Sequence, residues 1–372
     1  MGGSARELFL SPPAGAAPLR PPAQLISLAT ASPPHVFEQT AVGEAARAIF
    51  ADRYRDFERL FPVFQNTGIQ RRQAARPMEW YFEQHSWPER SAAYLTGALE
   101  LFIDAARSAL ARAGVEAAEV DTIVTVSSTG IATPSLEARA MGAMGFRADV
   151  SRVPVFGLGC AGGVTGLGIA ARLAEARPGS LVLLVCVELC TLAVRIDELT
   201  SANMVATALF GDGAAACLIT TGAKGLAAFE GAGEHTWPGT LGIMGWNVDP
   251  VGFGVIFDRS IPIFAARHLA DAVDGIMARM AIARGDVGRF VCHPGGARVI
   301  EALEGALDLG QGALDVEREV LADHGNMSAP TALFVLERVL ARAAETPKAA
   351  RERLMLCALG PGFTASMVSL AA

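Results

Sequence analysis

The chain has 372 residues, of which 31 are Lys or Arg and 38 are Asp or Glu, so its formal net charge is −7. Proteins that bind nucleic acids usually show the opposite balance, and we expect no nucleic-acid partner. Hydrophobic residues make up 51% of the chain and charged residues 19%. This composition supplies a large core and carries too little charge for disorder.

The mean hydropathy of +0.34 raises the question of a membrane span. The richest apolar run, residues 181–187, ends at Glu188 and has the length of a strand. A spanning helix needs roughly 20 apolar residues, so the sequence predicts no membrane span. Several prolines interrupt the start of the chain. We therefore expect a flexible tail over residues 1–23 and no secretory signal.

The first half alternates between predicted strands and predicted helices. Near-continuous apolar runs predict strands at residues 23–31, 121–127, 153–158, 181–187 and 214–220. Helical spacing predicts helices at residues 40–61, 89–114 and 161–175, whereas the aromatic and basic stretch 71–87 gives no clear element. Apolar strands separated by helices favour an α/β protein with buried, mainly parallel sheets.

The second half follows the same order. Strands are predicted at residues 289–292, 354–359 and 365–370, and helices at residues 296–307 and 333–344. Two short motifs also repeat. Cys160-Ala-Gly-Gly matches His293-Pro-Gly-Gly, and the small-residue pattern of 211–219 matches that of 360–368. These repeats predict a duplicated α/β unit, with one half at residues 24–221 and the other at 222–372.

Six cysteines lie mainly in apolar runs and include no C-x-x-C pair. This pattern is typical of buried thiols in a reducing compartment, so we expect a cytoplasmic protein. Cys160 is the exception, because it follows a strand and opens a helix whose first residues are Ala-Gly-Gly. The helix dipole and the free N–H groups of the first turn favour a thiolate there, although an isolated cysteine is more often a small buried hydrophobe.

His293 and Asn326 supply polar groups in the second half. A histidine at a strand end is more often structural, but halves packed face to face would bring His293 to Cys160, where an imidazole accepts the thiol proton. An Asn that follows a Gly commonly serves only to form a turn. Its amide N–H can also donate a hydrogen bond to a developing oxyanion. With no carboxylate at these three positions and no metal-ligand spacing, enolate or oxyanion chemistry on a thioester is favoured over metal-assisted hydrolysis.

Five motifs now occur together in one order, from about residue 26 to the C-terminus. They are Phe156-Gly-Leu-Gly-Cys160-Ala-Gly-Gly, Ala208-Leu-Phe210-Gly-Asp-Gly-Ala-Ala, His293-Pro-Gly-Gly, Gly325-Asn326-Met-Ser and Gly360-Pro-Gly362-Phe. The combination resembles type III polyketide synthases, the chalcone and stilbene synthase family.

The resemblance implies a thiolase fold, in which two βαβαβαββ halves form a five-layered αβαβα architecture, and a homodimer. It implies a catalytic triad of Cys160, His293 and Asn326, with acyl-CoA and malonyl-CoA as substrates and neither a cofactor nor a metal. Phe210 and Phe257 are the implied aromatic gatekeepers of the cavity. The motifs imply further substrate-binding positions at Gly295, Ser328, Gly360, Pro361 and Gly362.

Several positions differ from the plant members of the family. Ala358-Leu359 replaces Gly-Phe, and only Arg59 lies close to the spacing of the basic residues that bind CoA. Thr133 stands where a Met enters the partner subunit's cavity, and Ala193 aligns with a cavity-lining Thr. These substitutions resemble bacterial alkylresorcinol and alkylpyrone synthases, because a smaller wall residue leaves room for a longer acyl chain.

We therefore expect an enzyme that loads an acyl group onto Cys160 and extends it with malonyl-CoA by repeated decarboxylative Claisen condensation. Fatty acyl-CoA starters would give an alkylpyrone or alkylresorcinol. One alternative is a ketoacyl synthase III-like enzyme of fatty-acid initiation, although its His typically precedes Gln-Ala-Asn and here Pro-Gly-Gly follows His293. Another is a type III synthase with an aromatic or malonyl starter. A non-catalytic acyl-binding protein would have lost a triad residue.

Overall fold

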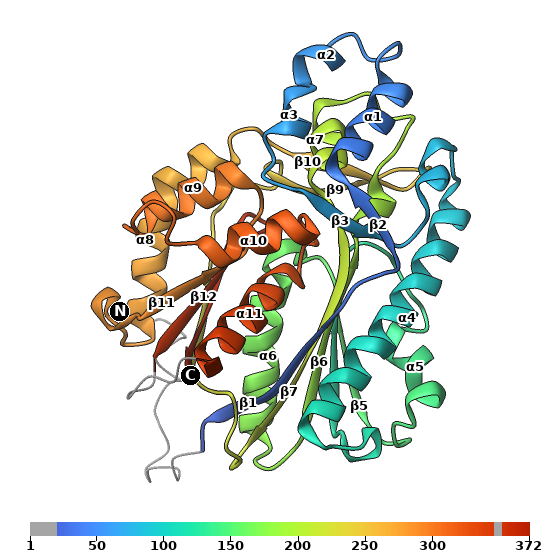
Figure 1. The fold of residues 1–372 in the computed structure, drawn as a ribbon. Coiled ribbons are helices and arrows are strands. Elements are labelled where there is room, and N and C mark those ends of the chain that lie inside the picture. Colours follow the sequence, from blue (N-terminus) through green and yellow to red (C-terminus); the bar gives the residue numbers. More distant parts are fainter. Residues whose placement is uncertain (1–20, 346–351) are drawn as a thin grey trace, which may run out of the picture.

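The computed structural model describes residues 21–345 and 352–372 (Figure 1). The flexible tail predicted at residues 1–23 lies almost wholly outside the described residues, and the first strand begins at Ala23. Among the described residues, the search for a helix long and apolar enough to cross a bilayer finds none.

Nine strands form one sheet. Their order is β11 (Arg289–Cys292), β12 (Arg353–Gly360), β13 (Thr364–Ala371), β8 (Ala227–Thr236), β1 (Ala23–Ala31), β7 (Asp212–Thr221), β6 (Val182–Leu189), β4 (Thr122–Val126) and β5 (Ser151–Val155). β1 and β8 share only the pairs Gln24–Ala228 and Leu25–Ala227. The strands therefore fall into two groups that are joined at one short contact.

The two groups of strands repeat one pattern of pairing. β4 runs parallel to β6, which is followed by antiparallel β7 and β1. β11 likewise runs parallel to β12, which is followed by antiparallel β13 and β8. The prediction of mainly parallel sheets is wrong, since only the β4–β5, β4–β6 and β11–β12 pairs are parallel. Continuous apolar character reports burial on both faces and carries no information on strand direction.

Helices cover both faces of each group. α6 (Gly162–Ala176) and α11 (Thr331–Glu345) lie side by side between the two groups, and their apolar residues form the central core cluster (Figure 1). α4 (Trp87–Ala113) and α5 (Leu136–Met144) cover the outer face of the first group. α8 (Ile261–Arg279) and α9 (Ala297–Ala306) cover the second. This arrangement confirms the predicted five-layered thiolase architecture.

One motif pairing proposed from the sequence is correct and the other is wrong. The runs 211–219 and 360–368 both lead into the strand next to the joint, β7 and β13. Cys160, however, follows β5, whereas His293 follows β11, whose place in the sheet matches that of β4. The structural counterpart of the turn before α6 is the turn at residues 325–330 before α11. A Gly-Gly pair after a strand is too short a signal to align the two halves.

A small region of short elements sits above the sheet in Figure 1. The helix predicted at residues 40–61 is divided into α1 (Gln39–Phe50) and α2 (Phe57–Leu60), because the intervening Ala-Asp-Arg-Tyr-Arg-Asp run offers little apolar surface. The unassigned stretch 71–87 contains β3 (Arg71–Ala74) and the turn Met78–Phe82. The neighbouring elements are β2 (His35–Glu38), α3 (Pro62–Gln65) and α7 (Ser201–Leu209).

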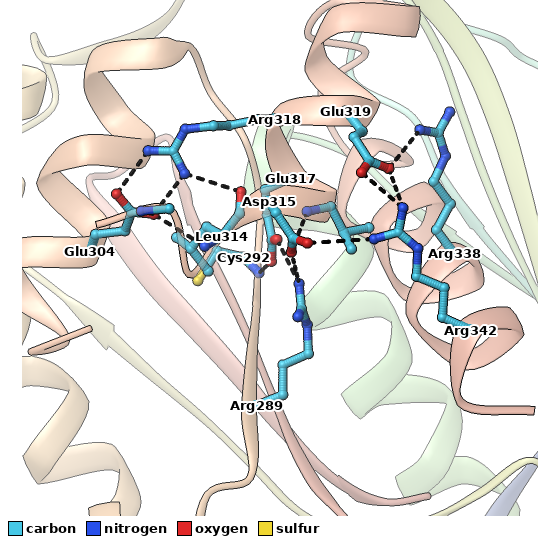
Figure 2. Close-up of polar contacts among 12 residues, drawn as sticks. Arg289, Cys292, Glu304, Leu314, Asp315, Glu317, Arg318, Glu319, Arg338 and Arg342 are labelled. Atoms are coloured by element: carbon cyan, nitrogen blue, oxygen red, sulfur yellow. Dashed lines mark hydrogen bonds and ion pairs between the residues drawn. The ribbon is translucent and has the colours of Figure 1, made fainter. Parts of the chain in front are cut away.

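β11 forms an open edge of the sheet, and acidic side chains from the start of α10 (Asp315–His324) bond to it. The backbone N–H of Cys292 donates to the Glu317 carboxylate at 2.9 Å, and the Arg289 guanidinium donates to Glu317 and Asp315 at 3.2 Å each (Figure 2). Burial raises the pKa of Glu317 to about 7. A side-chain carboxylate therefore satisfies an edge N–H group that a further strand would otherwise accept.

Candidate active site

Cys160 lies in a tight turn, Gly159–Ala161, at the start of α6. A Cβ on Gly163 would lie 2.2 Å from the carbonyl oxygen of Ala329, and a Cβ on Gly360 would lie 2.6 Å from Ala161. The small residues predicted to allow a close backbone approach do so here. They let the turns before α6 and α11 pack directly against each other.

A cavity of about 20 Å³ lies where these turns meet. Cys160, His293 and Asn326 all line it, although they come from three separate parts of the chain. Of the other predicted positions, Phe257 and Gly295 also line this cavity. The rest of the wall is mainly apolar and consists of Met244, Ile261, Val299, Leu303, Cys357, Ala358 and Leu359.

Asn326 is held by its backbone and by its amide. Its N–H donates to the Leu209 carbonyl at 2.8 Å, and its own carbonyl accepts from Gly211 N–H at 3.0 Å. The side-chain Oδ1 accepts from the Ser328 backbone N–H at 2.8 Å and lies 3.9 Å from the Cys160 sulfur. The Ser328 N–H needs an acceptor, so the end of the Asn326 amide that faces it is the oxygen. The other end, Nδ2, donates to the Gly295 carbonyl at 3.3 Å. One Nδ2 proton is thus used within the protein.

The imidazole of His293 is buried, and neither ring nitrogen has a hydrogen-bond partner among the described residues. Its backbone N–H donates to the Cys357 carbonyl at 2.8 Å, which fixes the residue at the end of β11. Burial lowers the pKa of His293 to about 4. The ring is therefore neutral at physiological pH, with two nitrogens available to a bound molecule.

Burial also dominates at Cys160. It raises the pKa of the Cys160 thiol to about 12, while hydrogen bonding with Ser328 and Asn326 opposes part of that rise. The sequence argument weighed the helix N-terminus and a neighbouring imidazole and predicted a favoured thiolate, whereas burial favours the neutral forms of both the Cys160 thiol and the His293 imidazole. Loss of the Cys160 proton therefore has to be coupled to substrate binding or to transfer of that proton to another group.

A carboxylate that the sequence analysis missed lies next to the triad. Glu188 is fully buried and accepts hydrogen bonds from Ser128 N–H at 2.9 Å and from Thr129 N–H at 3.0 Å. The Ser328 hydroxyl also points to it, at 3.5 Å. Burial raises the pKa of Glu188 to about 7. Its signal was a charged residue directly after a continuous apolar strand, which we interpreted only as the end of that strand.

Phe210, Ser328, Pro361 and Gly362 are predicted positions that do not line the cavity. Phe210 forms a backbone bridge to Asn326, and its ring meets Trp246 edge-on at 6.2 Å between ring centroids. Ser328 reaches the site through its contacts with Asn326 and Glu188. Pro361 packs against Gly159, and Gly362, with a φ of 119°, turns the chain from β12 to β13.

Three predicted positions lie away from the cavity wall. Ala193 is buried in the short helix Cys190–Ala193, and Thr133 is exposed in the loop before α5. Arg59 is exposed on α2 and pairs with Asp56 at 3.2 Å. In residues 21–345 and 352–372, no three His, Cys, Asp or Glu side chains are grouped to hold a metal ion.

Sequence reasoning also missed a hairpin that closes over the site, formed by β9 (Met244–Val248) and β10 (Phe253–Phe257). Met244 and Phe257 are paired across it, and both line the cavity. The Trp246 indole donates to the Ser128 carbonyl at 2.8 Å. Large side chains from the hairpin thus occupy space beside Cys160.

A buried thiol that meets an imidazole and an amide between two duplicated α/β halves is typical of thiolase-fold enzymes that transfer acyl groups. Comparison with known proteins assigns the chain to the same class. The sequence signature of the N-terminal domain of chalcone and stilbene synthases matches residues 16–223, and that of their C-terminal domain matches residues 230–372. The chain belongs to the chalcone and stilbene synthase family. It is a type III polyketide synthase, a malonyl-CoA-dependent acyltransferase, and this decides against the fatty-acid initiation enzyme.

Two curated relatives match almost the whole chain. A 1,3,6,8-tetrahydroxynaphthalene synthase of Streptomyces peucetius subsp. caesius is 39% identical, over 92% of this chain and 91% of its own length. A putative chalcone synthase of Bacillus subtilis is 34% identical, over 92% of this chain and 97% of its own length. The crystal structure of the 1,3,6,8-tetrahydroxynaphthalene synthase of Streptomyces coelicolor superposes with a TM-score of 0.87 at 27% identity, covering 94% of this chain and 99% of that one.

Proposed function

We propose that Cys160, His293 and Asn326 are the catalytic triad of this synthase. The neutral His293 ring accepts the Cys160 proton as the sulfur attacks an acyl-CoA carbonyl, and CoA leaves as its thiol. Malonyl-CoA then loses carbon dioxide, and N–H groups of His293 and Asn326 stabilise the enolate oxygen. The enolate carbon attacks the acyl–Cys160 thioester, and repetition extends the chain before cyclisation.

We further propose that the starter is small and that malonyl-CoA alone suffices to form an aromatic polyketide such as 1,3,6,8-tetrahydroxynaphthalene. The observation that carries this proposal is the 39% identity, over 92% of this chain, with the 1,3,6,8-tetrahydroxynaphthalene synthase of Streptomyces peucetius subsp. caesius. Met244 and Phe257 also line and narrow the cavity at Cys160, which favours a small starter. A poly-β-keto chain built from malonyl units is short and polar, so it needs less apolar depth than a fatty acyl chain.

The test is to incubate the protein with malonyl-CoA, alone and with a panel of acetyl-, fatty acyl- and aromatic acyl-CoA starters, and to identify the products by mass spectrometry. We expect the same malonyl-derived product in every mixture, and none with the Cys160→Ala variant. Products that carry the added fatty acyl group as the main species would contradict the malonyl starter but leave the family assignment intact.

The alkylpyrone or alkylresorcinol activity expected from the sequence is the second candidate. It is favoured by a separate apolar pocket of about 50 Å³ that has Phe210 as part of its wall. The pocket is lined by Phe37, Val42, Ile49 and Met78, among other side chains. Because buried methylenes contribute about 0.8 kcal/mol each, an alkyl chain that displaced Phe210 would be stabilised there.

The protein is further proposed to act as a cytoplasmic homodimer without a cofactor other than its CoA thioesters, with halves at residues 24–221 and 222–372. Ile131 and Phe156 support the dimer, because both are large apolar residues that are 55% exposed close to the outer strand β5. Phe156→Asp should shift the protein toward the monomer in sedimentation velocity, and an unchanged sedimentation coefficient would contradict this interface.

A further inference from the structure

Cys292 and Cys357 lie directly opposite each other in neighbouring strands. They are paired residues of the parallel β11–β12 ladder, and both are at most 1% exposed. Both belong to the apolar cluster under α8 and α9. Paired strands lie about 4.8 Å apart, and disulfides join Cα atoms about 4.4–6.8 Å apart. The backbone therefore already has the spacing of a disulfide.

The sheet contains a second cysteine pair that serves as a matched comparison. Cys186 on β6 and Cys217 on β7 are equally buried and face the central cluster. In the antiparallel ladder, however, Cys186 is opposite Ala215, and Cys217 is opposite Leu184. The two cysteines are thus diagonal neighbours, about 7–8 Å apart, which is beyond the usual reach of a disulfide.

The directly opposed pair is also connected to the active site. Cys357 and Cys160 line the same cavity, so a small reagent that enters the cavity reaches Cys357. Cys292 immediately precedes His293, whose N–H donates to the Cys357 carbonyl at 2.8 Å. On its other side, Cys292 is held by the bond from its N–H to Glu317 (Figure 2). A change in the position of either sulfur therefore acts on the strand ends that hold the imidazole.

We propose that Cys292 and Cys357 are a modification site, at which hydrogen peroxide forms a reversible disulfide that ties β11 to β12 beside the catalytic cavity. The Cys357 sulfur attacks one peroxide oxygen, the O–O bond breaks, and the first water leaves with the sulfenic acid in place. The Cys292 sulfur then attacks the Cys357 sulfur, the S–O bond breaks, and the second water leaves. The two sulfurs lose two electrons in total, and their protons end in the two waters.

The chemical test uses the full-length Cys160→Ala protein, which lacks the catalytic thiol as a competitor. After hydrogen peroxide treatment, free thiols are blocked with N-ethylmaleimide, and the protein is digested and mapped by mass spectrometry without reduction. We expect a cross-linked peptide that contains Cys292 and Cys357, with the loss of two free thiols, and its disappearance after dithiothreitol. Oxidised Cys357 without the cross-link, or an equal yield of a Cys186–Cys217 cross-link, would overturn the proposal.

The functional test compares wild type with the Cys292→Ala variant, each normalised to its own activity after full reduction. We expect peroxide to cause a larger dithiothreitol-reversible loss of polyketide formation in wild type than in Cys292→Ala. Cys186→Ala, which removes a buried thiol from the diagonal pair, should lose the same fraction as wild type. Equal reversible losses in wild type and Cys292→Ala would contradict a role for the bridge in activity.

Discussion

The turns that precede the two central helices occupy equivalent places in the duplicated fold but carry different chemistry. The turn before α6 holds Cys160 and is built from small residues. The turn before α11 holds Asn326 and Ser328, whose polar groups bond to each other and to Gly295 and Glu188. One turn permits close approach, and the other fixes the direction of an amide.

This difference shows how one duplicated scaffold supports two complementary roles. A Cβ on Gly163 would lie 2.2 Å from the carbonyl oxygen of Ala329. The two turns can therefore be in direct contact only because residue 163 has no side chain. Asn326 then lies 3.9 Å from the Cys160 sulfur without any sequence proximity. Cys160 and Asn326, the proposed nucleophile and oxyanion donor, are therefore positioned by the packing of the two helices.

The first way to test this difference between the turns is to remove the Cys160 thiol from the turn before α6. Cys160→Ser should retain the fold, because the side chain changes little in size, and should lower condensation by at least about 1,000-fold. Peptide mapping of the wild type after incubation with a starter acyl-CoA should find the acyl group on Cys160 alone. An adduct on Cys190 or Cys292 instead would show that the assignment of Cys160 as the nucleophile is wrong.

The second way is to remove the amide from the opposite turn. Loss of one preorganised oxyanion donor typically costs on the order of 3 kcal/mol, or ~100-fold in rate. Asn326→Ala should slow malonyl-CoA decarboxylation by about that factor, while acylation of Cys160 stays comparatively fast. The two half-reactions are measured by carbon dioxide release and by intact-protein mass, and an equal loss in both would make Asn326 a structural residue.

The contact between the turns can be broken without touching the triad. Gly163→Ala should lower the free energy of unfolding by about 1–3 kcal/mol, because its Cβ overlaps the Ala329 carbonyl. Gly142→Ala is the matched control on α5, where a Cβ meets nothing within 4 Å, and it should raise stability by up to about 1 kcal/mol. Urea unfolding measures both, and an unaffected Gly163→Ala protein would contradict the close packing.

The buried groups around the turns should also give stability a pH dependence. The folded-state pKa of His293, about 4, lies below its ordinary value of 6.5, so the unfolded chain binds more protons between these values and stability should rise with pH there. For Glu188 the folded-state pKa of about 7 lies above 4.5, so stability should fall as pH rises through that window.

Single variants separate these opposing effects. Compared with wild type, His293→Gln should gain relative stability at pH below about 5, and Glu188→Gln should gain it above about 7. Unfolding curves taken at acidic and alkaline pH measure the difference. Parallel shifts of a variant at every pH would show that the corresponding group has the same pKa in the folded and unfolded states.

The smallest expected effect concerns Arg59, which lies outside both turns. If the exposed Arg59 contributes to CoA binding, Arg59→Ala should raise KM for malonyl-CoA by about fivefold, since an exposed ion pair contributes up to about 1 kcal/mol. Arg107→Ala, an exposed arginine on α4, is the control and should leave KM unchanged. Equal KM values for the two variants would remove Arg59 from the CoA site.

The sequence singled out Cys160, His293 and Asn326 because each lies in a turn motif of the family, and the structure brings all three to one cavity. The α/β class followed from the apolar strands and helical spacing, whereas the layered thiolase fold was implied by the family resemblance. Strand direction did not follow from the apolar pattern, because a strand such as β7 is buried along its whole length whichever way it runs. Trp246 and Cys357 were missed for a related reason, since their place beside Cys160 depends on a hairpin and a strand pairing formed between distant segments.

The pairing of β1 has a consequence for synthesis of the chain on the ribosome. β1 is the first described strand, yet it lies in the middle of the sheet, and Ala23 pairs with Thr221, which is 221 − 23 = 198 residues later. At about 5–20 residues per second, β1 waits about 10–40 seconds for that partner. During this interval both of its edges are open, so the nascent chain exposes an apolar strand that chaperones would have to shield until β7 emerges.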